Sequence, residues 1–224
     1  MSATNRKAKN PKNKTEREEN DFYPTPEWTV HRFLEKTDGR LPGGLWLEPC
    51  AGEGAIISAV RSSKSARRHV PFHAVELQER FIENLLELPG VYKATSCNFL
   101  DWKWLESTNG QRSERADVII TNPPYTLAYD MVKHALKQAD AVCMLLRINF
   151  LASELRCEWM QEHTPDIFVL PNRPSFRGKG TDACEYAWFL WDKHSNGKIT
   201  ILNSTPKSVR MAEKKKQLSN KQTI

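Results

Sequence analysis

Short apolar runs that alternate with segments of helical period constrain the fold of this chain more than any other feature of its sequence. The segments between the runs place apolar residues on one face of a helix, most clearly around Leu127 to Leu136 and around Phe81 to Leu88. Seven runs are predicted as strands, namely 45–48, 72–76, 92–95, 117–121, 141–146, 167–170 and 185–191, with 199–202 as a candidate addition. The alternation predicts an α/β fold, in which helices pack on both faces of a mainly parallel, seven-stranded sheet.

Length and charge predict how the chain is organised. The 224 residues suffice for one substantial core, so we expect a single catalytic domain. Residues 1–20 hold six basic against three acidic residues, and residues 203–224 hold six against one, whereas the whole chain carries +6. We therefore expect a domain over residues 21–203 between two flexible basic arms, 1–20 and 204–224. Such arms either attract a polyanion in a salt-dependent way or only solubilise the protein, and both interpretations stay open.

The cysteines indicate reduced thiols, because the five are scattered and include no Cys-x-x-Cys pair. Cys143, Cys157, His163 and Cys184 contain no pair with the spacing of a zinc finger, so we expect no metal. No apolar stretch approaches the roughly 20 residues that cross a bilayer, and the N-terminus lacks the apolar region of a signal peptide. We therefore expect no membrane partner.

Ligands of such sheets bind beyond the carboxyl ends of the strands, so the residues that follow each strand are the candidates for a site. Gly52 and Gly54 follow the first predicted strand and let the backbone turn tightly towards a ligand. The second strand ends at Glu76, which can accept from both hydroxyls of a ribose. Asn98 and Phe99 follow the third, where an amide can pair with an adenine edge and a ring can stack on it, although Phe99 could equally be a core residue. Together these features favour a nucleoside cofactor.

The fourth predicted strand runs directly into Asn122-Pro123-Pro124-Tyr125, the most informative tetrapeptide of the chain. Two prolines fix φ and remove backbone donors, so the loop is rigid and the Pro123 carbonyl can accept from a substrate. With the side-chain oxygen of Asn122, it forms a two-acceptor clamp that suits an amino group with two N–H donors. The Tyr125 ring can stack on a planar substrate, which is worth about 1–3 kcal/mol for a nucleobase.

These motifs, in this order, resemble those of the amino-methylating DNA methyltransferases of the adenine-N6 type, and the resemblance covers residues 21 to about 191. Residues 21–26 resemble the family's N-terminal cofactor motif, Glu48 to Gly54 its glycine-rich loop, and the Asn122 tetrapeptide its catalytic motif. The stretches 173–176 and 182–187 are similar to small phage-borne members. The chain departs from the family at Asn98, where members usually carry an aspartate that touches the cofactor's adenine.

The resemblance implies a Rossmann-like, S-adenosylmethionine-dependent methyltransferase that methylates the exocyclic N6 amino group of a flipped-out adenine in double-stranded DNA. The implied catalytic residues are Asn122, Pro123, Pro124 and Tyr125. The implied cofactor-binding residues are Phe22, Tyr23, Pro24, Thr25, Glu48, Pro49, Cys50, Ala51, Gly52, Gly54, Glu76, Asn98, Phe99 and Asn122. Such an enzyme is expected in the cytoplasm of a bacterium or of a phage-infected host. The oligomeric state is left open, and a monomer is compatible with the sequence.

Basic residues beside the fifth and sixth predicted strands are candidates for contacts with phosphates or guanine edges, or else form an ordinary solvated basic face. They are Arg147, Arg156, Arg173, Arg177 and Lys179. We expect the loops between residues 148 and 183 to read the target sequence, because the chain has little room for a separate recognition domain.

Cys50 follows Pro49, and a Pro-Cys pair also occurs in cytosine-C5 methyltransferases, where its cysteine is the nucleophile. That nucleophile follows the fourth strand, whereas Cys50 follows the first, so we assign Cys50 to packing of the cofactor loop.

Two other functions remain open. One is methylation of an RNA base or of a protein glutamine amide, because related enzymes use the same tetrapeptide, although residues 22–26 favour DNA. The other is a catalytically inactive nucleic-acid-binding protein that keeps the fold, which Asn98 and the basic ends suggest.

Overall fold

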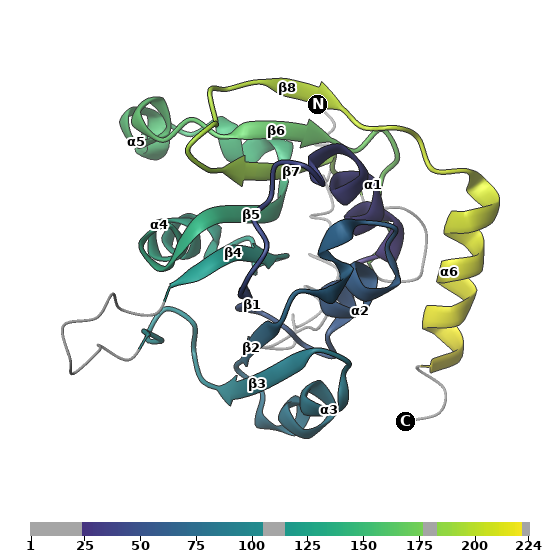
Figure 1. Cartoon of the computed structure of the whole chain (residues 1–224). Helices are drawn as coiled ribbons and strands as arrows, with labels where there is room; N and C mark the ends of the chain where they lie inside the picture. Colours follow the sequence, from purple (N-terminus) through teal and green to yellow (C-terminus); the bar gives the residue numbers. More distant parts are fainter. Residues whose placement is uncertain (1–23, 105–114, 177–182, 221–224) are drawn as a thin grey trace, which may run out of the picture.

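A central sheet of eight strands organises the computed structural model, which describes residues 24–104, 115–176 and 183–220 (Figure 1). The strands are β1 (Trp46–Glu48), β2 (Phe72–Glu76), β3 (Val91–Ser96), β4 (Ala116–Thr121), β5 (Ala139–Arg147), β6 (Asp166–Val169), β7 (Tyr186–Trp191) and β8 (Ile199–Ile201). The seven predicted strands are all present. The predicted total was one strand short, because the candidate addition at 199–202 forms β8 on the sheet edge beside β6.

The strand order β3-β2-β1-β4-β5-β7-β6-β8 decides which residues meet at one edge. Strands β3, β2, β1, β4 and β5 are parallel, whereas β7 runs antiparallel to both β5 and β6. The carboxyl ends of β1 to β6 therefore share one edge, and the start of β7 joins them there, since Arg147 pairs with Tyr186. The mainly parallel α/β sheet expected from the sequence is confirmed.

Helices cover both faces of the sheet, as predicted (Figure 1). The helices α1 (Glu27–Thr37), α2 (Ala55–Ser62) and α3 (Ile82–Glu87) belong to one core, and α4 (Ala128–Gln138) and α5 (Cys157–Glu162) to the other. Four short 3-10 helices connect these elements, at Ala66–His69, Glu79–Phe81, Ile148–Leu151 and Glu154–Arg156.

Successive strand residues alternate between the two cores, because side chains along a strand point to opposite faces. In β4, Val118 and Ile120 pack on the side of α1, and Ile119 packs on the side of α4. All six residues of β7 are buried, as expected for a strand that is covered on both faces.

The helical apolar faces are confirmed in part. Met131, Val132 and Ala135 of α4 and Leu85 of α3 are buried against the sheet. By contrast, Leu127 and Leu86 are 43% and 50% exposed. The reason is that Leu127 precedes α4, and that Leu86 is rotated by about 100° around α3 from the buried Leu85.

A buried ion-pair network joins the turn after α1 to the far half of the sheet. Arg40 Nη1 lies 2.6 Å from Asp166 Oδ2, and Arg40 Nη2 lies 2.6 Å from Asp192 Oδ1. Both carboxylates are almost completely buried, at 3% and 7% side-chain exposure, so each depends on its bonds to Arg40 and to neighbouring backbone N–H groups.

The end of the chain differs from the flexible arm expected from residue 204. Residues Lys207–Asn220 form the helix α6, which lies beside α1 at the side of the molecule (Figure 1). Its Glu213 Oε1 accepts from the backbone N–H of Trp28 at 2.9 Å, in the first turn of α1, where N–H groups have no partner within their own helix. Burial raises the pKa of Glu213 to about 7. Glu213 thus caps α1 from a distant part of the chain.

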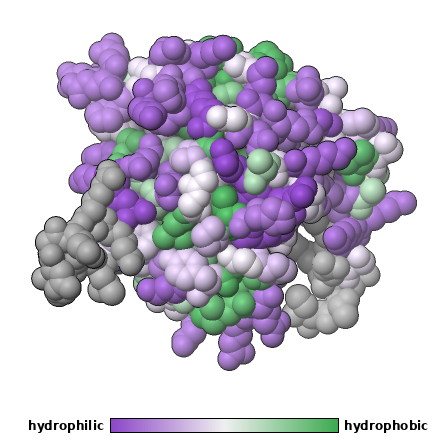
Figure 2. Space-filling view, in the orientation of Figure 1, coloured by the Kyte–Doolittle hydropathy of each residue, from purple (hydrophilic) through white to green (hydrophobic). Residues whose placement is uncertain are grey.

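The surface in the same orientation is mainly hydrophilic, and hydrophobic side chains form small separate groups (Figure 2). None of the helices in the described part of the chain is long and apolar enough to cross a bilayer.

Candidate active site

The loop between β1 and α2 contains the predicted glycine turn. Gly52 and Gly54 have φ values of 51° and 74°, in the left-handed region that favours glycine. A Cβ on Gly54 would lie 2.1 Å from Leu88 Cδ1, because the end of α3 packs directly against the loop. The backbone N–H of Ala51 donates to the Val75 carbonyl at 3.2 Å and holds the loop against β2.

Glu76, the last residue of β2, lies beside this loop as predicted. Its Oε2 accepts from the Gly52 N–H at 2.7 Å, and its Oε1 accepts from the Gln78 N–H at 2.9 Å. A carboxylate offers about four acceptor positions, so each oxygen can still take a further donor. With 7% exposure, the side chain is held in one place at the end of the strand.

Glu48, the last residue of β1, is a buried carboxyl with an unmatched oxygen. The residue is 2% exposed, and its Oε2 has no hydrogen-bond partner among the described residues. Burial raises the pKa of Glu48 well above its usual range, the Ile57 N–H opposes this rise, and the nearby Glu76 adds to it. Because an unpaired buried polar atom costs about 1–3 kcal/mol, this oxygen suits a hydrogen-bonding partner that the protein itself does not supply.

Cys50 lies in the same loop, next to the buried Pro49. Burial raises the pKa of the Cys50 thiol, and the charge of Glu76 adds to the rise. Because only a thiolate is a strong nucleophile, the surroundings of Cys50 support a packing role.

The residues after β3 differ in their surroundings. Asn98 Nδ2 donates to Asp101 Oδ2 at 3.1 Å, and its Oδ1 accepts from the Leu100 N–H at 3.1 Å, which leaves one lone pair of Oδ1. Phe99 is 3% exposed and packs edge-on against His134, with 4.8 Å between ring centroids. The structure therefore places Phe99 in the core beside α4, which is the alternative to stacking on an adenine.

The tetrapeptide Asn122 to Tyr125 follows β4 directly and forms a small hydrogen-bond network. Asn122 Nδ2 donates to Thr25 Oγ1 at 3.1 Å, and the Tyr125 hydroxyl donates to Asn122 Oδ1 at 3.0 Å. Thr25 is 6% exposed and precedes α1. Within the described ranges, no backbone donor contacts the Pro123 carbonyl, and its role as an acceptor for a substrate stays a prediction.

A cationic and aromatic group surrounds the Tyr125 ring. The Arg147 guanidinium lies 4.8 Å from the ring centroid, at the distance of a cation–π contact, and Arg147 Nε donates to the Tyr186 hydroxyl at 3.3 Å. The rings of Tyr125 and Tyr186 are 5.7 Å apart. Tyr186 was missed by sequence reasoning. Its signals were its place in the stretch 182–187, which carries part of the resemblance, and an aromatic residue at the start of a predicted strand. Its position at this edge depends on the antiparallel direction of β7.

Two of the other predicted basic residues are engaged elsewhere. Arg156 Nε and Nη2 donate to the Phe150 carbonyl at 3.2 and 2.9 Å, and Arg173 pairs with Glu185 on the surface. Four predicted site residues lie outside the described part of the chain, namely Phe22, Tyr23, Arg177 and Lys179.

Among the described residues, no three His, Cys, Asp or Glu side chains gather as a metal site. The five cysteines are free thiols, and they range from the buried Cys143 to the exposed Cys157.

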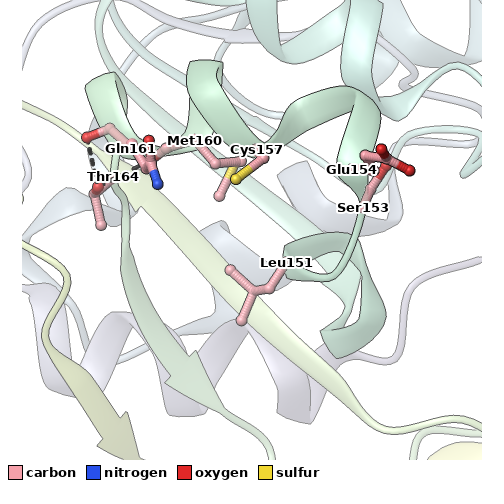
Figure 3. Close-up of a pocket in the computed structure, with 7 residues that line it drawn as sticks. All are labelled: Leu151, Ser153, Glu154, Cys157, Met160, Gln161 and Thr164. Carbon is pink, nitrogen blue, oxygen red and sulfur yellow. Dashed lines mark hydrogen bonds between the residues drawn. The ribbon is translucent and has the colours of Figure 1, made fainter.

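A hollow of about 430 Å³ lies within the segment 148–183, between the helical turns after β5 and the helix α5 (Figure 3). Its lining residues are Leu151, Ser153, Glu154, Cys157, Met160, Gln161 and Thr164. No predicted site residue is among them. The hollow is thus separate from the network around Asn122, and target reading by residues 148–183 stays a prediction.

No protein-family model matches the sequence, and no curated protein matches it significantly. Solved structures do resemble its fold. The methyltransferase subunit of a type I restriction-modification system from Streptococcus thermophilus has a TM-score of 0.57 and 13% identity, over 89% of this chain and 52% of that chain. A modification subunit of a putative type I restriction enzyme from Vibrio vulnificus has a TM-score of 0.55 and 17% identity, over 82% of this chain and 46% of that chain. The chain therefore spans about half the length of these two proteins.

A putative RNA methyltransferase from Pyrococcus horikoshii is similar over most of its own length. It has a TM-score of 0.54 and 19% identity, over 76% of this chain and 87% of that chain. At such low identity the likeness concerns architecture. The chain thus has the Rossmann-like α/β fold that these methyltransferase structures share.

Proposed function

We propose that this protein transfers a methyl group from S-adenosylmethionine to the exocyclic N6 amino group of a flipped-out adenine in DNA. The observation that carries the proposal is the network around Asn122, in which Thr25 and the Tyr125 hydroxyl hold the amide in place directly before Pro123, at the carboxyl end of β4. The likeness of the fold to subunits of type I restriction-modification systems supports it.

The residues at the ends of β1 and β2 fit the proposed cofactor. When bound, S-adenosylmethionine supplies a methyl group that is already activated by its sulfonium. Gly52 and Gly54 let the backbone approach a ligand, and Glu76 retains acceptor positions for ribose hydroxyls. The unmatched oxygen of Glu48 offers a hydrogen-bonding position to the cofactor.

Asn122 and Pro123 would act on the substrate amino group. The amino nitrogen of adenine is a poor nucleophile, because its lone pair is delocalised into the ring. If its two N–H groups donate to Asn122 Oδ1 and the Pro123 carbonyl, these bonds favour a more tetrahedral geometry of the nitrogen. They also stabilise the positive charge that develops on the nitrogen as it attacks the methyl group. The Tyr125 hydroxyl uses one lone pair of Asn122 Oδ1, so the second remains for the substrate.

A DNA substrate requires the base to leave the duplex, since the amino group is otherwise inside the helix. Unpairing and unstacking the base costs free energy, and stacking of the extruded base on Tyr125 would offset about 1–3 kcal/mol of this cost. The net charge of +6 favours approach to a polyanion, and the affinity would fall as salt increases.

Methylation of an RNA base is the second candidate. It is favoured by the structural likeness to a putative RNA methyltransferase from Pyrococcus horikoshii. The same acceptor pair could also hold the amide of a protein glutamine.

Methyl incorporation from labelled S-adenosylmethionine separates these substrates. Unmethylated duplex DNA, structured RNA and a protein extract are supplied in parallel, and we expect label chiefly in DNA. Asn122→Ala should lower the rate by about 100-fold or more, because one preorganised partner of the developing charge is lost. Asn196→Ala, an exposed asparagine after β7, is the matched control and should keep the parent rate. Label in RNA or protein alone would overturn the DNA assignment.

A further inference from the structure

We propose that Thr25 is a positioning residue that holds the Asn122 amide in place from its nitrogen side, rather than a ligand of the cofactor. The inference rests on the proposed function, since it assigns the group that keeps Asn122 Oδ1 directed at the substrate. The two residues are 97 positions apart in the sequence and meet through the 3.1 Å bond from Asn122 Nδ2 to Thr25 Oγ1.

The orientation of an asparagine amide is set by its neighbours. Its oxygen accepts and its nitrogen donates, and the two ends have nearly the same shape. The Tyr125 hydroxyl donates to Asn122 Oδ1 at 3.0 Å and restrains the oxygen end, but a single bond leaves the amide free to rotate about it. The bond from Asn122 Nδ2 to Thr25 Oγ1 restrains the nitrogen end, so the two bonds together fix the plane of the amide.

The surroundings of Thr25 make its hydroxyl available as an acceptor. A threonine just before a helix commonly accepts from backbone N–H groups of the first turn. Pro26, which follows Thr25, has no N–H, and the Trp28 N–H donates instead to Glu213 of α6 at 2.9 Å. The hydroxyl is also shielded from water, since Thr25 is 6% exposed, so water cannot readily replace it as a partner of Asn122.

The consequence concerns the chemical step. If the amide rotated out of this plane, Asn122 Oδ1 would no longer point at the amino group of the substrate, and an acceptor would be missing where one is required. Loss of the Thr25 hydroxyl should therefore lower kcat, because the acceptor is correctly oriented for a smaller share of the time. Cofactor binding at the ends of β1 and β2 should be unaffected.

The experiment compares Thr25→Val, which removes the hydroxyl at nearly constant shape, with Thr25→Ser, which keeps it. Thr29→Val is the matched control, because Thr29 is fully buried one turn further on, and its hydroxyl donates to the Pro26 carbonyl at 2.7 Å without contacting Asn122. For each variant we measure kcat on duplex DNA, calorimetric affinity for S-adenosylmethionine, and the side-chain amide signals of Asn122 by NMR. The NMR signals are assigned by their absence in Asn122→Ala and are recorded on the protein alone.

We expect Thr25→Val to lower kcat about tenfold, which corresponds to about 1.4 kcal/mol. The affinity for S-adenosylmethionine should stay within about twofold, a difference of under about 0.5 kcal/mol. The Asn122 amide signals should shift and exchange faster with solvent. Thr25→Ser should restore both kcat and the amide signals, and Thr29→Val should leave both close to the parent.

Weaker S-adenosylmethionine binding with unchanged kcat in Thr25→Val would overturn the inference and make Thr25 a cofactor ligand. Equal losses in Thr25→Val and Thr29→Val would also overturn it, since the effect would then be a general result of losing a buried hydroxyl. If the parent protein methylates no DNA, the proposed function fails by itself. The NMR comparison then decides the inference, because a changed Asn122 amide in Thr25→Val supports it and an unchanged one refutes it.

Discussion

Replacing Gly54 by alanine should destabilise the protein by about 2–4 kcal/mol. The φ of Gly54 is 74°, and a residue with a Cβ costs about 1–2 kcal/mol in that region. The added Cβ would also lie 2.1 Å from Leu88 Cδ1 and 3.2 Å from Leu85 Cδ2, so these side chains must move. Overpacking of this kind costs about 1–3 kcal/mol, less where a partly buried side chain such as Leu88 can turn away.

Thermal and urea unfolding measure the loss. For a chain of 224 residues, each kcal/mol lowers Tm by about 2–4 °C, so Gly54→Ala should lower it by roughly 4–16 °C. Gly39→Ala is the first control, because no atom lies within 4 Å of the added Cβ. Gly197→Ala is the second, since its φ of 84° imposes a similar backbone cost with only one contact at 3.0 Å.

The double variant Gly54→Ala/Leu88→Ala separates the two contributions. Removing the Leu88 side chain should relieve the collision but not the backbone cost, so the two substitutions should be less destabilising together than the sum of their separate effects. A Tm of Gly54→Ala equal to that of Gly39→Ala would refute the reasoning and, with it, the tight approach of α3 to the proposed cofactor loop.

Three further predictions concern other parts of the molecule. Burial lowers the pKa of His73 from 6.5 to about 4, so the unfolded chain binds this proton more readily. The free energy of unfolding should therefore be highest above pH 6.5 and fall by about 3 kcal/mol towards pH 4. Urea unfolding at pH 7.5 and 4.5 should show a weaker pH dependence for His73→Leu than for the parent protein. An unchanged pH dependence would contradict the assignment. Arg40→Met leaves Asp166 and Asp192 without their shared cation. The free energy of unfolding, measured with urea, should fall by about 3–5 kcal/mol, and an unchanged value would contradict a structural role of the network. Cys50→Ser should transfer methyl groups at close to the parent rate, because burial keeps the thiol protonated, and complete loss of transfer in a folded variant would restore Cys50 as a nucleophile.

The features that the sequence predicts correctly are local ones. Apolar runs and the glycine turn after β1 are readable because strand and turn preferences depend on adjacent residues. The position of Glu76 beside Gly52 also follows, since parallel neighbours end at one edge.

The features that the sequence does not reveal depend on distant contacts. Thr25 meets Asn122 across 97 positions, and Tyr186 reaches the site because β7 runs antiparallel to β5. The basic C-terminal segment has the composition of a flexible arm, yet Glu213 joins it to α1 across 185 positions. Phe99 shows the same limit, because a ring after a strand can face either a ligand or the core, and only the packing of α4 decides.

The most direct measurement is mass spectrometry of nucleosides from duplex DNA that has been incubated with the purified protein and S-adenosylmethionine. We expect N6-methyladenine to accumulate with the parent protein. With folded Asn122→Ala, it should form more slowly by about 100-fold or more. Absence of N6-methyladenine with the parent, or equal rates for the two proteins, would contradict the proposed function of the Asn122 network.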